Sequence, residues 1–199
     1  MNKIKTIIFL LCIIFSVTAY AQSYSEAHTQ LKNSKIEINS SSLVLYASQG
    51  DLLIVSLLIR AGISPSDSEP QHTVTALHAA AGQGHLKVIS ELLKLAAPVN
   101  AVDACGYTPL MVAAYFAQFY AVSLLVKHDG SMLDHQASCG LTPLIAAVQS
   151  GNLKIVDVLL SAGAKPHISD VFGNTPLKIA NLSKRVEIAK RIQAALIKQ

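Results

Sequence analysis

The sequence lacks most of the features that would indicate a charged partner. Only 14 % of its 199 residues are charged, aromatic residues make up 6 %, and tryptophan is absent. The formal net charge is +4, of which Lys3 and Lys5 contribute two charges in a segment that we expect to be removed, which leaves 4 − 2 = +2. This excess is too small to predict a nucleic-acid-binding surface, so we expect no nucleic-acid partner. Apolar residues make up 51 %, which excludes a disordered chain by composition.

Signatures of catalysis and of metal binding are also missing from the sequence. It contains no glycine-rich phosphate loop and no serine in a nucleophile-elbow motif. The seven histidines are scattered, and no two of them have metal-ligand spacing on one helix. We therefore expect no catalytic residues, no metal site, no cofactor and no enzyme activity.

The only long apolar run lies near the N-terminus, where Ile7–Val17 is interrupted by Ser16 alone. Positive residues precede it, and Ala19–Ala21 follows with the small-x-small pattern of a cleavage site. The run is shorter than the ~20 residues of a membrane span. The pattern predicts a signal peptide over residues 1–21, cut before Gln22, with an uncleaved anchor as the alternative. We expect an exported protein, periplasmic or else secreted, with no membrane insertion after cleavage.

What the sequence does contain is a repeat of 33 or 34 residues. Thr75, Thr108, Thr142 and Thr175 open similar segments, and a degenerate copy starts at Ser41. Threonine and serine favour the residue that caps a helix, and the proline that follows three of the threonines suits the first helical turn. A leucine recurs two residues after each start, as Leu43, Leu77, Leu110, Leu144 and Leu177.

Each repeat also carries the end of this first helix and an apolar stripe for a second helix. The first helix is expected to end where glycine provides a left-handed residue, and the corresponding positions are Gly50, Gly84, Ala117, Gly151 and Lys184. A second apolar column follows with 3.6-residue periodicity, at Leu58, Leu92, Leu125, Leu159 and Ile192. One helix pair cannot bury its apolar face alone, so the copies are expected to stack.

These motifs resemble the ankyrin-repeat family. The resemblance implies an all-α repeat fold, a solenoid of about five helix-turn-helix repeats with β-turn fingers. It covers residues 41–199, with repeats starting near 41, 75, 108, 142 and 175. Only His78 keeps the histidine of the family's Thr-Pro-Leu-His signature, where its role is structural. The segment from Gly62 to Thr75 is longer than its counterparts and predicts an irregular first finger.

The two ends of the chain are expected to cap the stack. Residues 22–40 form an N-terminal capping segment, in which Ser23-x-x-Glu26 resembles a capping box that would start a helix reaching about Lys32. The segment from Ser183 to Gln199 predicts an amphipathic last helix whose polar face shields the open end.

The resemblance also implies where a partner binds, because ankyrin proteins generally use the finger tips and the exposed end of the first helix. The third repeat crowds aromatic residues into this region, although some of them are expected to fill the core, as Phe119 does at a leucine position. Exposed aromatic residues commonly anchor protein interfaces. The predicted contact residues are His72, Gln83, Tyr107, Tyr115, Phe116, Tyr120, Leu141, Gln149, Ser150, Phe172 and Asn174.

The expected function is therefore a non-catalytic protein-protein interaction module, monomeric when unbound, that acts as adaptor, inhibitor or helper of another protein. Exported bacterial members of the family include toxin-neutralising partners, helpers of catalases and effectors aimed at host cells, and the sequence does not separate these roles. A second hypothesis is a small-molecule, haem or metal/redox handling protein that uses Cys105 and Cys139.

Cys105 and Cys139 occupy the same position in neighbouring fingers, 34 residues apart. Stacked repeats lie ~10 Å apart, whereas a disulfide needs Cα atoms within ~7 Å, so we expect free thiols. Export to an oxidising compartment leaves a strained, redox-active bridge as the alternative. His72 holds the same position one finger earlier, and the three residues together span too far to share one metal ion.

Overall fold

The computed structural model describes residues 21–128 and 131–197. Within them, a helix over residues 21–33 precedes five helix pairs, and the only β pairing is an isolated antiparallel bridge between Ser68 and Thr75. The pairs are α2 (Ser40–Gln49) with α3 (Leu52–Arg60), α4 (Ala76–Gln83) with α5 (Leu86–Lys94), α6 (Pro109–Tyr115) with α7 (Phe119–Val126), α8 (Pro143–Ser150) with α9 (Leu153–Ser161), and α10 (Pro176–Leu182) with α11 (Val186–Ile197).

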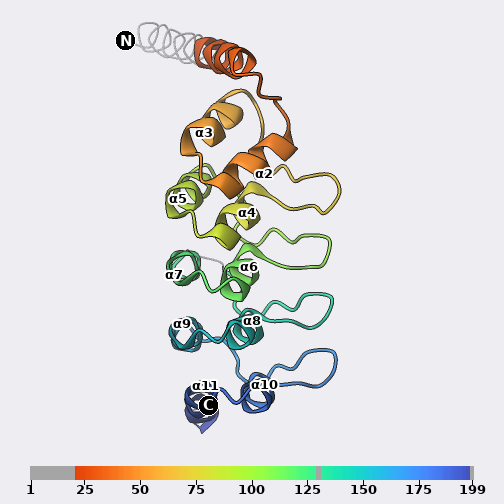
Figure 1. The fold of residues 1–199 in the computed structure, drawn as a ribbon, viewed down its shortest axis with the longest axis vertical. Coiled ribbons are helices and arrows are strands. Elements are labelled where there is room, and N and C mark those ends of the chain that lie inside the picture. The colour runs from red at the N-terminus through yellow and green to blue at the C-terminus, as the bar shows by residue number, and fades with distance from the viewer. Residues whose placement is uncertain (1–20, 129–130, 198–199) are drawn as a thin grey trace, which may run out of the picture.

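The helix pairs stack into a rod with three parallel columns (Figure 1). The first helices of the repeats form the middle column, the second helices form the left-hand column, and the fingers project to the right. Consecutive first helices pack more extensively on one another than consecutive second helices do. The predicted all-α stack of about five repeats is confirmed.

The first helices begin where the repeat pattern predicts, with one exception. The hydroxyls of Thr75, Thr108, Thr142 and Thr175 each accept a hydrogen bond from the backbone N–H three residues later, at 3.1–3.4 Å. Proline occupies the first turn of α6, α8 and α10. In the first repeat, however, the capping residue is Asn39 rather than Ser41, and its side chain accepts from Ser42 N at 2.7 Å. An amide oxygen at residue 39 caps as well as a hydroxyl does, so the helix starts two residues early.

The ends of the first helices are also as predicted. Gly50, Gly84 and Gly151 have φ of 75–77°, the left-handed conformation. Ala117 and Lys184 adopt it as well, with φ of 58° and 55°, although a side chain makes it costly. The repeat geometry therefore imposes this turn even where the sequence has no glycine.

A continuous core runs along the rod between the two helix columns. All five members of the second leucine column, and the first four of the first column, are buried. Side chains that precede the second helices add links between repeats, since His85 Nε2 lies 2.9 Å from Ser48 O and Gln118 Nε2 donates to Gly82 O at 3.0 Å. Arg185 makes the corresponding bond to Val148 O. These bonds satisfy carbonyls that a helix end leaves without a partner.

The predicted capping box at Ser23 is wrong. Residue 21 is already helical, so Ser23 lies within the helix, and its hydroxyl accepts a hydrogen bond from Arg60 Nε at 2.9 Å instead. This helix extends to residue 33 and packs Ala27 and Leu31 against the core. The predicted signal peptide lies outside the described residues, apart from residue 21.

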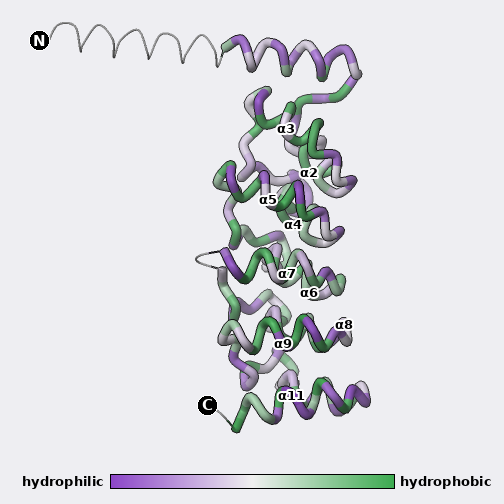
Figure 2. Tube along the Cα trace, turned by 90° about the vertical axis from the view of Figure 1, so that its left-hand side faces the viewer, coloured by the Kyte–Doolittle hydropathy of each residue, from purple (hydrophilic) through white to green (hydrophobic). Residues whose placement is uncertain are grey.

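The last helix alternates hydrophobic and hydrophilic positions, as Figure 2 shows along α11. Ile188 and Ile192 are buried against the stack, while Lys190 and Arg191 stay on the surface, paired with Glu187 and Asp157. In the described part of the chain, no helix combines the length and the apolar character needed to cross a membrane.

Candidate functional site

The fingers form a hydrogen-bonded ladder along one side of the rod. Ala104 N donates to His72 O at 2.9 Å, Ser138 N to Cys105 O at 3.0 Å, and Val171 N to Cys139 O at 3.2 Å. Each finger is thereby tied to the next through the residue three positions before the capping threonine. The ladder thereby joins neighbouring fingers into one hydrogen-bonded row beside the first helices.

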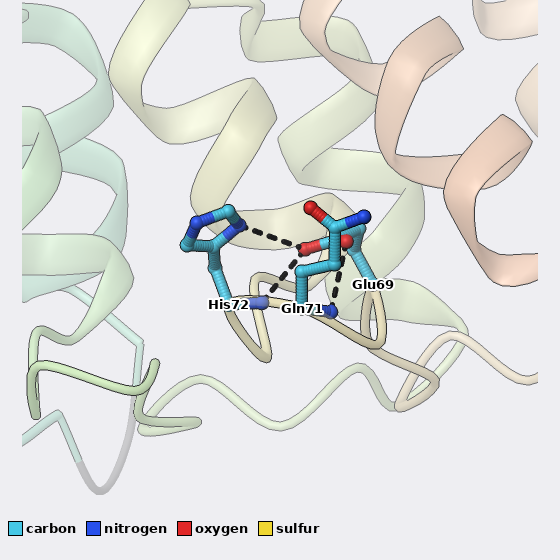
Figure 3. A network of polar contacts seen from close by, with 3 residues as sticks. All are labelled: Glu69, Gln71 and His72. Atoms are coloured by element: carbon cyan, nitrogen blue, oxygen red, sulfur yellow. Dashed lines mark hydrogen bonds and ion pairs between the residues drawn. The ribbon is translucent and has the colours of Figure 1, made fainter.

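The turn of the first finger is one residue longer than those of later fingers, since Glu69 N donates to Val74 O whereas Asp103 N donates to Tyr107 O. Glu69 organises this irregular finger (Figure 3). Its carboxylate accepts from the backbone N–H groups of Gln71 and His72, both at 2.9 Å, and lies 3.3 Å from His72 Nδ1. These hydrogen bonds, led by the one from Gln71, lower the pKa of Glu69. The predicted contact residue His72 therefore lies at a finger tip with its ring directed to Glu69.

Carboxylates brace two later fingers in the same way. Asp103 Oδ1 accepts from the N–H groups of Cys105 and Tyr107 at 2.9 Å, and Asp170 Oδ1 accepts from Phe172 N at 2.9 Å and Asn174 N at 2.8 Å. The finger between them has Ala137 at this position and lacks the brace. Most of the acidic groups on the finger side are thus used to hold the fingers.

A groove of about 480 Å³ lies beside α6, between the third and fourth repeats. Helix α6 forms one side of it, and the finger before Thr142 and the end of α8 contribute the other. Its lining residues are Tyr107, Met111, Val112, Tyr115, Phe116, Cys139, Leu141 and Gln149. None of these eight described residues is charged, and none is a histidine.

Two aromatic side chains stand at the end of α6, on the edge of this groove. The rings of Tyr115 and Phe116 meet edge to face with centroids 5.4 Å apart, and these residues are 53 % and 59 % exposed. Phe116 lies next to Gly82 on α4, where a Cβ atom would meet Phe116 Cδ2 at 3.6 Å and Val112 Cγ1 at 2.9 Å. The bare backbone at Gly82 therefore gives α6 and its phenyl ring room to pack against α4.

Tyr107 connects the groove to the finger ladder. Its hydroxyl lies 3.7 Å from Cys139 Sγ, and its carbonyl lies 2.8 Å from His78 Nε2. The contact with Cys139, followed by burial, raises the pKa of Tyr107 to about 12, so the phenol stays protonated at neutral pH. The His78 ring also contacts Thr75 Oγ1 at 2.9 Å, and burial lowers the pKa of His78. This histidine has the structural role implied by the family resemblance.

The structure brings five of the predicted contact residues together around the groove: Tyr107, Tyr115, Phe116, Leu141 and Gln149. Leu141 is only 7 % exposed, so it belongs to the core as much as to the groove wall. Leu141, directly before the capping Thr142, therefore forms part of the groove wall rather than its exposed edge, and its contact with a partner stays a prediction.

The other predicted contact residues do not line the groove. Gln83 is exposed at the end of α4, Phe172 is 80 % exposed on the last finger, and Tyr120 is 70 % exposed on α7 in the second-helix column. The remaining side chains are used locally, since Ser150 Oγ donates to Ala147 O and Asn174 Nδ2 donates to Asp170 Oδ2.

The groove also contains three residues that are not among the predicted contacts, namely Met111, Val112 and Cys139. Met111 is fully buried and lies beneath the groove, whereas Val112 is half-buried.

Charge divides the two helix columns. The first helices α2, α4, α6 and α8 contain no Asp, Glu, Lys or Arg. Among the second helices, α5, α9 and α11 carry charges on their exposed faces. In the described part of the chain, no three His, Cys, Asp or Glu side chains gather closely enough to hold a metal ion together.

Comparison with known proteins agrees with this architecture. Residues 43–137 and 121–195 match the family of ankyrin repeats, described as three copies. The chain is 30 % identical over 156 residues to an ankyrin repeat domain-containing protein, SAT10, of Stachybotrys chartarum, covering 75 % of this chain and 8 % of that protein. It is 32 % identical over 108 residues to the tyrosine-protein kinase HTK16 of Hydra vulgaris, covering 54 % of this chain and 14 % of the kinase.

A bacterial protein is also similar. The phosphocholine transferase AnkX of Legionella pneumophila is 27 % identical over 152 residues, which cover 75 % of this chain and 16 % of AnkX. The chain thus spans a small part of the length of the relatives it matches.

Proposed function

Because the chain belongs to the ankyrin-repeat family, we propose that it is a non-catalytic protein-binding module whose groove beside α6 receives an uncharged, apolar segment of a partner protein. Ankyrin repeats typically mediate protein-protein interactions. The observation that carries the proposal is the groove itself, which combines an uncharged lining with a half-exposed pair of aromatic rings.

The chemistry of the groove favours an apolar partner over a charged one. A charged side chain that entered it would lose water and meet no opposite charge among the lining residues, which costs free energy. An apolar side chain would gain by leaving water, at about 25 cal/mol per Å² of buried surface. The rigid ladder of fingers also limits the entropy that is lost on binding.

The same lining supports a non-catalytic role. Its eight described residues include no carboxylate and no histidine to act as a general base, and the Tyr107 phenol, with a pKa of about 12, is a poor proton acceptor at neutral pH. The proposed module therefore acts by binding, as adaptor, inhibitor or helper of its partner.

We further propose that the protein is exported, to the periplasm or beyond, and acts there as a monomer until it meets its partner. The charged start, the short apolar run and the small residues at 19 and 21 support this. N-terminal sequencing of the protein recovered from the envelope fraction tests the proposal. A chain that starts at Gln22 agrees with export, and a chain that keeps residues 1–21 and stays in the cytoplasm contradicts it.

The binding proposal is tested by affinity capture from envelope extract with three baits. They are the wild-type chain, the double variant Tyr115→Ala/Phe116→Ala, and the control Tyr120→Ala, whose ring is also aromatic and exposed but lies on α7 and does not line the groove. Aromatic hot spots contribute about 2 kcal/mol or more each, so the double variant, which loses about 4 kcal/mol, should weaken binding of a captured partner by roughly 1,000-fold.

The control should bind as the wild type does, and unchanged circular dichroism of all three baits would exclude misfolding. A partner that binds the double variant as tightly as the wild type would show that the groove is not the contact surface. A partner lost only with Tyr120→Ala would move the contact to the second-helix side.

A further inference from the structure

We propose that Cys105 and Cys139 form a two-thiolate site, at the rim of the groove, for a soft monovalent metal ion of the Cu(I) class. Both thiols are free and exposed. They lie three residues before Thr108 and Thr142, at matching positions of neighbouring fingers. The site is separate from the protein-binding role, and either can hold without the other.

The finger ladder places the two cysteines side by side. Ser138, the residue before Cys139, donates its N–H to the carbonyl of Cys105 at 3.0 Å. This bond joins the fingers of the third and fourth repeats directly at the two cysteines, as neighbouring strands are joined in a sheet. The fingers hold this arrangement without the metal, so little ordering is required when an ion binds.

A bridge through a metal ion spans a wider range of separations than a direct disulfide does, and both thiols are free. A disulfide joins the two sulfur atoms by one bond of ~2.05 Å and needs Cα atoms within ~7 Å. Two metal–sulfur bonds of about 2.3 Å each, in a line, separate the sulfur atoms by about 4.6 Å and extend the reach by about 2.5 Å. The helices of neighbouring repeats stack at ~10 Å. The hydrogen bond from Ser138 N to Cys105 O draws the fingers closer together than this, so the two cysteines lie within the reach of a bridge through one ion.

The donor set selects the kind of ion. Thiolates prefer soft cations such as Cu(I). Zinc usually takes four protein ligands in a structural site, and no third His, Cys, Asp or Glu joins these thiols among the described residues. Asp103 is engaged by the N–H groups of Cys105 and Tyr107, and His72 contacts Glu69. Cu(I) is satisfied by two thiolates in a near-linear arrangement, so the pair alone is sufficient.

Tyr107 provides the outer contact that such a site requires. Its hydroxyl lies 3.7 Å from Cys139 Sγ and can donate to this sulfur atom, which would orient a thiolate ligand. Binding releases one proton from each thiol and leaves the copper in the +1 state, so the exchange needs no oxidant or reductant. Because Cys139 also lines the groove, the bound ion would sit at its edge.

The test is an anaerobic titration of the reduced full chain with Cu(I) held by a coloured Cu(I) chelator. The wild type is expected to withdraw one Cu(I) per chain from the chelator while remaining a monomer in gel filtration. Cys105→Ser and Cys139→Ser should each weaken this binding at least tenfold, whereas Tyr107→Phe should keep the stoichiometry of one. Blocking both thiols of the wild type with N-ethylmaleimide should abolish binding without any substitution.

The proposal is overturned if the wild type withdraws no Cu(I), if either single serine variant binds as tightly as the wild type, or if binding joins two chains into a dimer. Circular dichroism of each variant shows whether a loss reflects unfolding, and in that case the alkylated wild type decides. Because the partner capture described above needs no metal, failure of either experiment leaves the other proposal standing.

Discussion

The third repeat and its two neighbours share one backbone and differ in what they present to the solvent. Thr75, Thr108 and Thr142 cap their helices through the same hydrogen bond, and the leucines two residues later are buried in all three repeats. At the exposed end of the first helix the repeats diverge, to Gly82 and Gln83 in the second, Tyr115 and Phe116 in the third, and Gln149 and Ser150 in the fourth.

This difference separates the residues that build the rod from those that give it a function. The buried columns can change little, because each repeat is stabilised by its contacts with the next. The exposed positions are not under this constraint. The neighbouring repeats fold without an aromatic pair there, so the repeat fold does not require one. The comparison therefore agrees with the proposed division, in which the leucine columns provide stability and the end of α6 contacts the partner.

The largest expected effect comes from breaking what the repeats share. Leu110→Ala should lower the free energy of unfolding by about 2–5 kcal/mol, because it leaves a cavity in the core. The same substitution at Leu77 or Leu144 should cost a similar amount, whereas Tyr115→Ala, at an exposed position, should cost less than about 1 kcal/mol. Urea unfolding followed by circular dichroism measures all four. A larger loss for Tyr115→Ala than for Leu110→Ala would contradict the division.

Much of the helical framework can be predicted from the sequence because it depends on the spacing of residues along the chain. The threonine caps, the left-handed turns at Ala117 and Lys184, and the buried leucine columns all follow from a 33- or 34-residue period. The predicted start of the first helix differs from the observed one by two residues. Asn39 and Ser41 are both good capping residues, and the local sequence pattern does not distinguish between them.

The groove was predictable only in part. Crowded aromatic residues pointed to α6, but spacing along the chain does not give the direction in which a side chain points. The sequence therefore predicts Tyr120 as a contact residue together with Tyr115, although Tyr120 lies on α7, in the second-helix column. The contribution of Cys139 depends on the finger of the fourth repeat lying beside α6, which is a contact between repeats that no local motif encodes.

A smaller effect is expected at the turn after α6, where the third repeat has alanine in place of glycine. Ala117→Gly should stabilise the protein by about 0.5–1 kcal/mol. The left-handed conformation destabilises a residue with a side chain by roughly 1–2 kcal/mol, and the larger chain entropy that glycine loses on folding offsets part of the relief. The reverse change, Gly151→Ala, should destabilise, since its Cβ would also lie 2.9 Å from the Arg185 guanidinium carbon. Thermal unfolding of both variants checks the opposite signs.

The smallest expected effect is a dependence of stability on pH through His78, in the second repeat. Burial lowers the pKa of His78 in the folded protein, so the unfolded chain, in which the pKa of histidine is about 6.5, binds the proton more readily. The contribution of neutral His78 to stability is therefore complete above about pH 6.5 and is lost as the pH falls toward the folded-state pKa. The stability advantage of the wild type over His78→Gln should shrink below pH 6.5, as measured by urea unfolding at several pH values. An advantage that is constant or grows on acidification would contradict the assignment.

The most direct test of the central claim is site-specific photo-crosslinking to the captured partner. A benzophenone amino acid is placed at position 116, at the edge of the groove, or at position 120, on the second-helix side of the same repeat. The account predicts a crosslinked partner from position 116 and none from position 120. Crosslinking from position 120 with none from position 116 would contradict it.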